Sequence, residues 1–302
     1  ERTKLGAYLR AATENPSLVQ AFGVNVPRMV TLTYGFGVAL AALAGALKGV
    51  TFAAPDAKLK SEWAAAKAAV KAAPDGAGNA LPTDMQVVGA VQRASGAKTV
   101  VMGAAGTMPG ELHKIWDAAQ GGYHMEYGFS CMGYEIAGAM GIKMARPQAD
   151  VICMVGDGSY MMANSELATA VMMGIPFTTV ITDNRGYGCI NRLQQGTGGA
   201  PFNNLLDDSY HVNPSHIDFV AHAGSMGAIA VKAADIAELE VHLARAKTAD
   251  RPYVIVIDSD PGPSPAGGGT WWDVGVPEVS VRETVREASR LRLLEAAGLA
   301  VA

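Results

Sequence analysis

The sequence has 302 residues, a formal net charge of −4 and three cysteines. The length allows one large or two modest domains, and the lack of a basic excess argues against a nucleic-acid partner. The cysteines show no metal-ligand spacing and no disulfide pattern, which indicates reduced thiols in a cytoplasmic fold rather than a zinc site.

The first region, residues 1–53, begins at Glu1 and spreads charged residues over its first ten positions. We therefore expect no signal peptide there, and we expect a fragment or a processed product. The run from Met29 to Leu47 carries no charge, and as a helix of ~1.5 Å per residue it would cross most of a ~30 Å hydrocarbon core. Its small residues equally permit a buried helix, so an apolar helical segment is expected and membrane contact through 29–47 stays open.

The same region resembles branched-chain amino-acid ABC-transporter permeases, through "LRAATENPSLVQAFGVNVPRMVTLTYGFGVALAALAGALKG". A permease needs many spanning helices, so we expect no transport by this region alone. The resemblance implies a foreign N-terminal segment, with membrane association left open, joined to a different protein. Residues 54–80 follow as an Ala- and Lys-rich helix closed by Pro74-Asp75-Gly76, which we interpret as a helical linker.

The third region, residues 81–260, alternates strand and helix signals. Apolar or β-branched runs predict strands at Thr99–Met102, Asp150–Val155, Phe177–Thr182 and Val254–Asp258. Helical patterns fall at Val87–Ala94, Gly133–Met144, Asn164–Met173 and Ile236–Lys247. This alternation is typical of an α/β fold with a parallel sheet and helices on both faces, where ligands bind at the carboxyl ends of strands. The loops after residues 102, 155 and 182 are the candidate site, and 261–302 form a C-terminal extension in which we recognise no chemistry.

Two predicted strand ends carry residues suited to a metal. Asp157 lies between Gly156 and Gly158 after one buried strand, and Asn184 follows the next strand 27 positions later. One βαβ crossover would place both side chains at the same sheet edge, and carboxylate and amide oxygens suit Mg²⁺. The glycines admit a phosphate, and the helix after Ser159 offers it free N–H groups. A lone Gly-Asp-Gly would be an ordinary turn, but its spacing to "DNRGYG" favours the metal interpretation.

With "VICMVGDGSYMMANSELATAVMMGIPFTTVITDNRGYG", this motif resembles the metal and diphosphate signature of thiamine-diphosphate (ThDP) enzymes. The resemblance implies ThDP and Mg²⁺ as cofactors, with Asp157, Asn184 and the backbone carbonyl of Gly186 on the metal. It implies cofactor contacts for a set of small residues in the same loops, namely Gly156, Gly158 and Ser159. It also implies a first diphosphate-binding loop at Gly106 and Thr107.

The upstream segment "EYGFSCMGYEIAGAMG" resembles the part of these enzymes that holds the two rings of the cofactor. There Met132 would force the bent cofactor conformation, or would simply pack in the core. Gly128 would contact the pyrimidine through its backbone. His124 is the candidate catalytic residue that would meet substrate, with a structural histidine as the alternative. Arg192 would contact an anionic or polyhydroxylated substrate, or a surface carboxylate.

From about Leu81 to Val279 the chain resembles one narrow family, the 3D-(3,5/4)-trihydroxycyclohexane-1,2-dione hydrolases. The matching segments are "LPTDMQVVGAVQRA", "PGELHKIWDAAQGGYHMEYGFSCMGYEIAGAMGIKMA", "DNRGYGCINRLQQGTGGAPFNNLL" and "GGTWWDVGVPEVS". The resemblance implies hydrolytic C–C cleavage of a cyclic 1,2-diketone in inositol catabolism, with ThDP as the electron sink.

Enzymes of this class also use a pyrimidine-binding domain, whose glutamate comes from the partner subunit of a dimer. No candidate glutamate stands out, because Glu14 lies in the permease-like region and Glu62 in the predicted linker. We therefore expect a half-site that a homo-oligomer or a separate pyrimidine-binding domain completes. Two alternatives stay open: another ThDP enzyme of the acetolactate synthase or carboligase type, and a non-catalytic cofactor-binding fragment fused to a membrane segment.

Overall fold

The computed structural model describes residues 8, 11–12, 16–29, 31, 57–72, 80–126, 130–213, 215–262 and 275–296. The chain divides into two units, Glu1–Ala57 and Lys58–Ala302. In the first unit, the helix α2 (Pro16–Ala21) is described. None of the described helices is both long and apolar enough to cross a membrane. Most of the predicted apolar run 29–47 lies outside the described residues.

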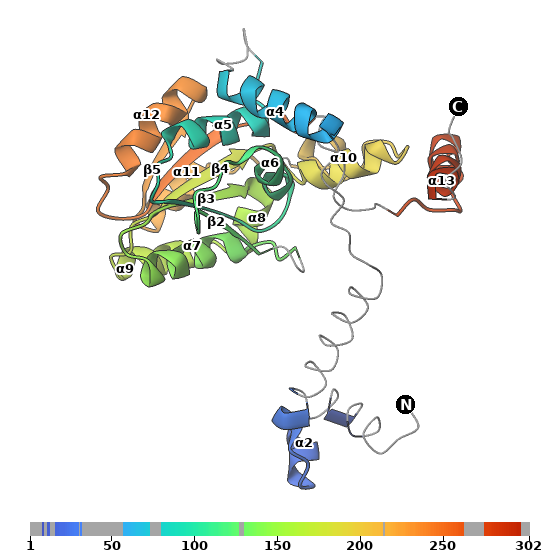
Figure 1. Ribbon diagram of the computed structural model, residues 1–302, viewed down its shortest axis with the longest axis horizontal. Helices are drawn as coiled ribbons and strands as arrows, with labels where there is room; N and C mark the ends of the chain where they lie inside the picture. The colour runs from blue at the N-terminus through green and yellow to red at the C-terminus, as the bar shows by residue number, and fades with distance from the viewer. Residues whose placement is uncertain are drawn as a thin grey trace. The chain divides into compact units, whose positions relative to one another are not determined.

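The second unit is built on a parallel six-stranded sheet (Figure 1). The strand order is β2-β1-β3-β4-β6-β5. The strands are β1 (Thr99–Gly103), β2 (Tyr123–Met125), β3 (Asp150–Gly156), β4 (Thr178–Asp183), β5 (Ile229–Ala233) and β6 (Tyr253–Asp258). The four predicted strands are confirmed as β1, β3, β4 and β6. The sequence patterns did not reveal β2 and β5, the two edge strands.

Helices cover both faces of this sheet, as predicted. In Figure 1, one side carries α4 (Ala57–Ala72), α5 (Asp84–Ala94) and α12 (Ile236–Ala246), and the other side carries α7 (Tyr134–Ala145) and α9 (Glu166–Met172). The remaining helices of the unit are α6 (Thr107–Ile115), α8 (Asp157–Met162), α10 (Gly188–Gly196), α11 (Phe219–Ser225), α13 (Glu283–Ala296) and the 3₁₀ helix η1 (Leu206–Asp208). The helix expected within the linker 54–80 is α4, and its Val70 is buried in the core.

The central strand β3 shows why its sequence is apolar without interruption. Ile152 and Met154 pack into the core cluster under α5, α6 and α12, whereas Val151, Cys153 and Val155 pack into the cluster under α7, α9 and α11. Successive side chains of a strand point to opposite faces, so a strand buried on both faces must be apolar at every position. This double burial fixes β3 at the centre of the sheet, with its carboxyl end at the candidate site.

Candidate functional site

The strand register brings the two halves of the predicted metal motif together. Gly156 at the end of β3 is paired with Thr182 near the end of β4. Asp157 therefore begins α8 beside the loop that carries Asn184, and both side chains are buried. Parallel strands end at one edge, which explains how residues 27 positions apart in sequence come to share one site.

Three oxygens converge at this edge. One terminal atom of the Asn184 amide lies 3.3 Å from Asp157 Oδ1 and 2.8 Å from the Gly186 carbonyl oxygen. As the amide nitrogen, this atom would donate a hydrogen bond to each of the two oxygens. A bound cation would instead favour the amide oxygen at this place, because octahedral Mg²⁺ with bonds of ~2.1 Å holds adjacent ligands about 3.0 Å apart. The donor set therefore fits Mg²⁺.

Only one of these donors is an acidic side chain. Within the described parts of the chain, no group of three or more His, Cys, Asp or Glu side chains is arranged to hold a metal ion. A site made of one carboxylate, one amide and one backbone carbonyl leaves other coordination positions for water and phosphate, which is how Mg²⁺ is commonly bound.

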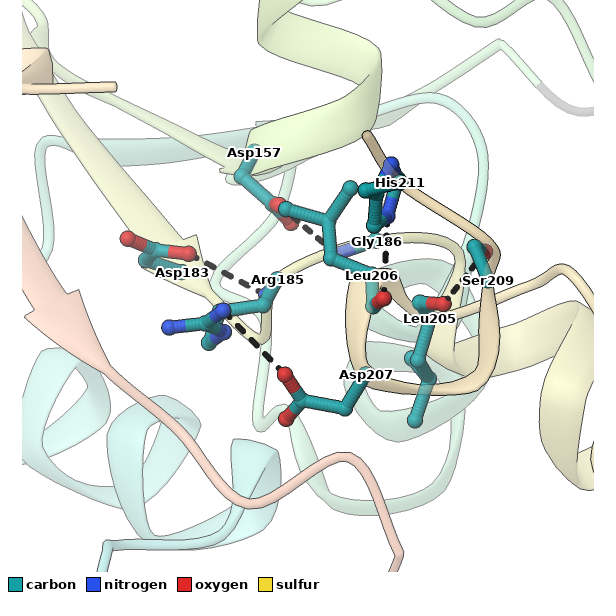
Figure 2. Close-up of polar contacts among 9 residues, drawn as sticks. All are labelled: Asp157, Asp183, Arg185, Gly186, Leu205, Leu206, Asp207, Ser209 and His211. Atoms are coloured by element: carbon teal, nitrogen blue, oxygen red, sulfur yellow. Dashed lines mark hydrogen bonds and ion pairs between the residues drawn. The ribbon is translucent and has the colours of Figure 1, made fainter. Parts of the chain in front are cut away.

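The metal loop, residues 185–187, is held in an unusual backbone conformation. Arg185 has φ of 61° and Gly186 has φ of 148°, both in the region that favours glycine. The Arg185 N–H donates to Asp183 Oδ1 at 3.1 Å, and the Gly186 N–H donates to Asp157 Oδ2 at 2.9 Å (Figure 2). These two bonds tie the loop to the ends of β3 and β4, and the second leaves Asp157 Oδ1 for a metal.

The surroundings of Asp157 disfavour the ionised form of its carboxyl group. Burial, together with the nearby Asp183 carboxylate, raises the pKa of Asp157 to about 7, against the opposing effect of backbone N–H donors. Burial also raises the pKa of Asp183. Removing carboxylates from water without a counter-charge disfavours their ionised forms. A bound cation would supply that counter-charge.

A cavity of about 300 Å³ opens beside the three oxygens. Seven of the predicted cofactor residues line it, namely Gly106, Met132, Gly156, Gly158, Ser159, Asn184 and Gly186. A Cβ at Gly158 would lie 2.7 Å from Cε1 of Tyr187, so glycine keeps this part of the wall open. The structure thus brings loops after β1, β3 and β4 around one cavity, as the strand–helix pattern predicts.

Two of the described residues predicted for the site, Asp157 and His124, do not line this cavity. Asp157 faces a neighbouring cavity of about 620 Å³ that shares Asn184 and Gly186 with the first. Thr107 is the first residue of α6. Exposed His124 lies on β2, with Nε2 3.3 Å from the Tyr134 hydroxyl, and its contact with substrate stays a prediction. Gly128 lies outside the described residues.

Helix α10 supplies a wall that the sequence patterns did not reveal. Its first turns place Ile190 and Leu193 along the cavity, next to Tyr187 and Cys189. The spacing of Ile190 and Leu193 at i and i+3 is a helical signal, but one turn of it is too short to stand out. Arg192 on the same helix is directed elsewhere, because its guanidinium lies 3.8 Å from the buried carboxylate of Asp84.

Glu135, which the sequence did not mark as functional, connects three segments of the cavity wall. Its carboxylate accepts the Ala105 N–H at 3.3 Å, the Gly133 N–H at 2.8 Å and the Ser159 hydroxyl at 2.8 Å. Burial raises the pKa of Glu135, although these donors oppose the rise. The Ser159 hydroxyl thus gives its hydrogen to Glu135, which leaves the backbone N–H of Ser159 at the start of α8.

Replacing this carboxylate by an amide should destabilise the cavity wall. In Glu135→Gln, one amide N–H₂ would face the N–H of Ala105 or Gly133, so a buried donor loses an accepting oxygen, although the Gly133 N–H would keep the Ser159 hydroxyl oxygen at 2.9 Å. We expect a loss of about 1–3 kcal/mol in the free energy of unfolding, measured by urea denaturation. Glu278→Gln, at an exposed position, is the control and should change little. Equal stability of both variants would show that the Glu135 bonds contribute nothing.

Two protein families and a solved structure match parts of this chain. Residues 104–257 match the family model of the thiamine pyrophosphate enzyme C-terminal TPP-binding domain. Residues 1–70 match the branched-chain amino acid transport system / permease component, which confirms the predicted resemblance and extends past residue 53. A solved structure, the thiamine diphosphate-dependent 4-hydroxybenzoylformate decarboxylase of Rhodococcus jostii RHA1, superposes with a TM-score of 0.53 at 21% identity over 62% of this chain and 34% of its own. At that identity the match shows the fold alone.

Curated relatives share more of the sequence. The 3D-(3,5/4)-trihydroxycyclohexane-1,2-dione hydrolase of Geobacillus thermodenitrificans is 39% identical over 215 residues, which cover 69% of this chain and 34% of that protein. Hydrolase 2 of the same name from Bacillus cereus is 38% identical over 213 residues, covering 68% and 33%. The chain thus spans about a third of the length of the curated relatives it matches.

Proposed function

We infer that this chain, which belongs to the thiamine pyrophosphate enzymes through their C-terminal TPP-binding domain, binds the diphosphate of ThDP through Mg²⁺ at the carboxyl ends of β3 and β4. The observation that carries this inference is the convergence of the Asp157, Asn184 and Gly186 oxygens next to the 300 Å³ cavity. A buried carboxylate beside two neutral oxygens is destabilising when no counter-charge is present. The same three groups are suitable ligands for Mg²⁺.

The residues around the cavity suggest how they would act. The N–H groups at the start of α8, including those of Gly158 and Ser159, would bind phosphate oxygens of the cofactor. When bound, ThDP supplies a carbon nucleophile and an electron sink for C–C bond cleavage. Met132 would hold the cofactor rings in their reactive arrangement, and the apolar wall of Ile190 and Leu193 would keep bulk water from them.

For the substrate, the names of the relatives support a cyclic 1,2-diketone. We propose that the full active site hydrolyses a C–C bond of such a ring in inositol catabolism, with His124 near the substrate. The chain covers about a third of those relatives. We therefore propose that catalysis also needs a pyrimidine-binding domain beyond residues 81–260, contributed within a homo-oligomer or by a separate polypeptide.

The test of the proposed function is a calorimetric titration of ThDP into the purified chain, with excess Mg²⁺ and again with excess EDTA. We expect binding with Mg²⁺ and none with EDTA, because the diphosphate is held through the metal. Thiamine, which lacks the phosphates, should not bind under either condition. Binding that is equally tight in EDTA, or no binding by a folded chain, would contradict the proposed diphosphate site.

Magnesium affinity should rise with pH. Because the pKa of Asp157 is about 7 in the folded, metal-free chain, a proton competes with Mg²⁺ below pH 7. We expect the affinity to fall about tenfold per pH unit below 7 and to level off above it. Mg²⁺ titrations between pH 5.5 and 8.5 check this. An affinity that does not change between pH 6 and 8 would show that Asp157 is already ionised.

The same shift has a consequence for the stability of the metal-free chain. An aspartate whose folded pKa lies above its unfolded value of 3.8 favours folding most when it is protonated. Its contribution is present below pH 3.8 and is lost as the pH rises through 7. Mg²⁺ should therefore raise the unfolding temperature more at pH 8 than at pH 6.

We propose that residues 81–260 function in the cytoplasm, and that the permease-like N-terminal region is where any membrane contact through 29–47 would arise. The similarity of residues 1–70 to a permease component supports this second point. Fractionation of cells without detergent tests both. Recovery of the chain wholly in the soluble fraction would contradict the membrane contact.

A further inference from the structure

A short segment lies across the metal loop and binds it through backbone hydrogen bonds. This segment, residues 203–209, is called the strap below. The Tyr187 N–H donates to the Asn204 carbonyl at 2.7 Å, and the Leu206 N–H donates to the Arg185 carbonyl at 2.9 Å. Between these two bonds, Gly186 and Leu205 form an antiparallel bridge. Figure 2 shows the strap folding around the loop that carries Arg185 and Gly186.

The strap is braced by hydrogen bonds within it and by a contact from His211 just beyond it. The Asn203 N–H donates to the Asp208 carbonyl at 3.2 Å, which closes the strap into a loop. The Ser209 hydroxyl donates to the Leu205 carbonyl at 2.7 Å. Nε2 of His211 lies 3.0 Å from the Leu206 carbonyl oxygen (Figure 2). A segment closed on itself in this way presents its outward carbonyl and N–H at fixed positions.

The strap has a direct effect on the third metal donor. It binds the carbonyl of Arg185 and the N–H of Tyr187, the groups on either side of the Gly186 carbonyl. The Gly186 carbonyl itself faces the amide group of Asn184, 2.8 Å away. The backbone of Arg185 and Gly186 has positive φ, and such conformations persist only where the surroundings impose them. The strap is the part of the surroundings that contacts the loop on both sides of Gly186.

The ion pair between the strap and the metal loop contributes less to their coupling than the backbone hydrogen bonds do. Arg185 Nη2 lies 3.2 Å from Asp207 Oδ1, and both side chains are exposed to water. Exposed ion pairs of this kind contribute little, so the backbone bonds carry the coupling. Removing the Asp207 carboxylate should therefore leave metal binding almost unchanged.

We infer that the strap is a positioning element for the metal: it sets the Mg²⁺ affinity by holding the Gly186 carbonyl at the coordination site. This inference rests on the proposed metal site and names a part of the chain, outside the metal motif, on which that site depends. Residues 203–209 touch neither Asp157 nor Asn184 through any of the bonds above, so their effect passes through the metal loop.

The experiment removes one of the two coupling bonds. Leu206→Pro deletes the N–H that binds the Arg185 carbonyl. Leu206 is the first residue of η1, where the φ of proline is suitable, and Leu205 before it is extended (φ −109°, ψ 151°), as a residue before proline prefers to be. Leu206→Ala keeps the N–H and removes most of the side chain, so it is the matched control. Binding is followed with Mn²⁺ in place of Mg²⁺, by electron paramagnetic resonance of the free ion, on the complete chain.

We expect Leu206→Pro to raise the Mn²⁺ dissociation constant about five- to tenfold, as the loss of one backbone bond predicts, and Leu206→Ala to leave it unchanged. Ser209→Ala removes the side-chain hydrogen bond to the Leu205 carbonyl but no backbone N–H, and it should raise the constant about twofold. If the strap had only a structural role, these variants would lower the midpoint of urea unfolding. Their metal affinity, measured at urea concentrations far below that midpoint, would not change.

Unchanged Mn²⁺ affinity in folded Leu206→Pro would overturn the inference while leaving the metal site intact. Should Leu206→Pro fail to fold, unchanged affinity in Ser209→Ala would overturn it in the same way. Failure of the folded wild-type chain to bind Mn²⁺ would instead contradict the proposed function itself.

Discussion

Asp157→Ala is expected to reduce metal-dependent binding of ThDP by roughly 100-fold or more, since loss of a supporting residue alone commonly costs 10–100-fold. Asp157 provides the one carboxylate among the three converging oxygens, and the amide of Asn184 and the carbonyl of Gly186 carry no formal charge. Without it, a divalent cation would have to leave water for neutral donors alone. Calorimetric titration with Mg²⁺ and ThDP measures the effect.

Asp183→Asn is the matched control for that variant. Asp183 is the neighbouring carboxylate, and its role in the loop is to accept the Arg185 N–H through Oδ1, which an asparagine oxygen can still do. Its repulsion of Asp157 would also be removed. We therefore expect binding to be kept, or slightly improved near neutral pH. If Asp157→Ala bound ThDP as tightly as Asp183→Asn, Asp157 would not be a metal ligand.

Gly186→Ala is expected to have the second large effect, on both stability and metal binding. The added methyl group would overlap the Asn204 carbonyl oxygen and lie 2.9 Å from Leu205 Cα, and both obstacles are backbone. The φ of 148° is also unfavourable for alanine. We expect the free energy of unfolding to fall by about 2–4 kcal/mol and Mg²⁺ binding to weaken strongly, because the strap and the loop cannot both keep their places.

The control for Gly186→Ala is Gly196→Ala. Gly196 is the last residue of α10, has no positive φ, and has open space where the methyl group of an alanine would lie. Replacing a helical glycine by alanine should raise stability by up to about 1 kcal/mol and leave metal binding unchanged. Urea denaturation and Mg²⁺ titration of both variants test the pair. A Gly186→Ala chain as stable as Gly196→Ala would show that the strap can move aside at little cost.

The sequence by itself determined the fold class and the chemistry at two strand ends. An apolar run such as Val151 to Val155 can be stable only where both faces of a strand are covered, so a central parallel strand follows from local composition. The spacing of Asp157 and Asn184 spans one βαβ crossover, and the direction of parallel strands then requires both to reach the same edge. These conclusions rest on short-range pattern and on a topology with few alternatives.

The tertiary structure alone decided which further residues surround that edge. The edge strand β2 has three residues, and both β2 and β5 are only partly buried, so their sequences carry no strong period. Glu135 looks like an ordinary residue of a helix's first turn until Ala105 and Ser159 are brought to it by other segments. The strap acts through the backbone of Asn204 and Leu206, and every residue type except proline offers the same N–H and carbonyl groups. Contacts of this kind leave no mark in the sequence, because they depend on where the chain returns and not on which side chains it carries.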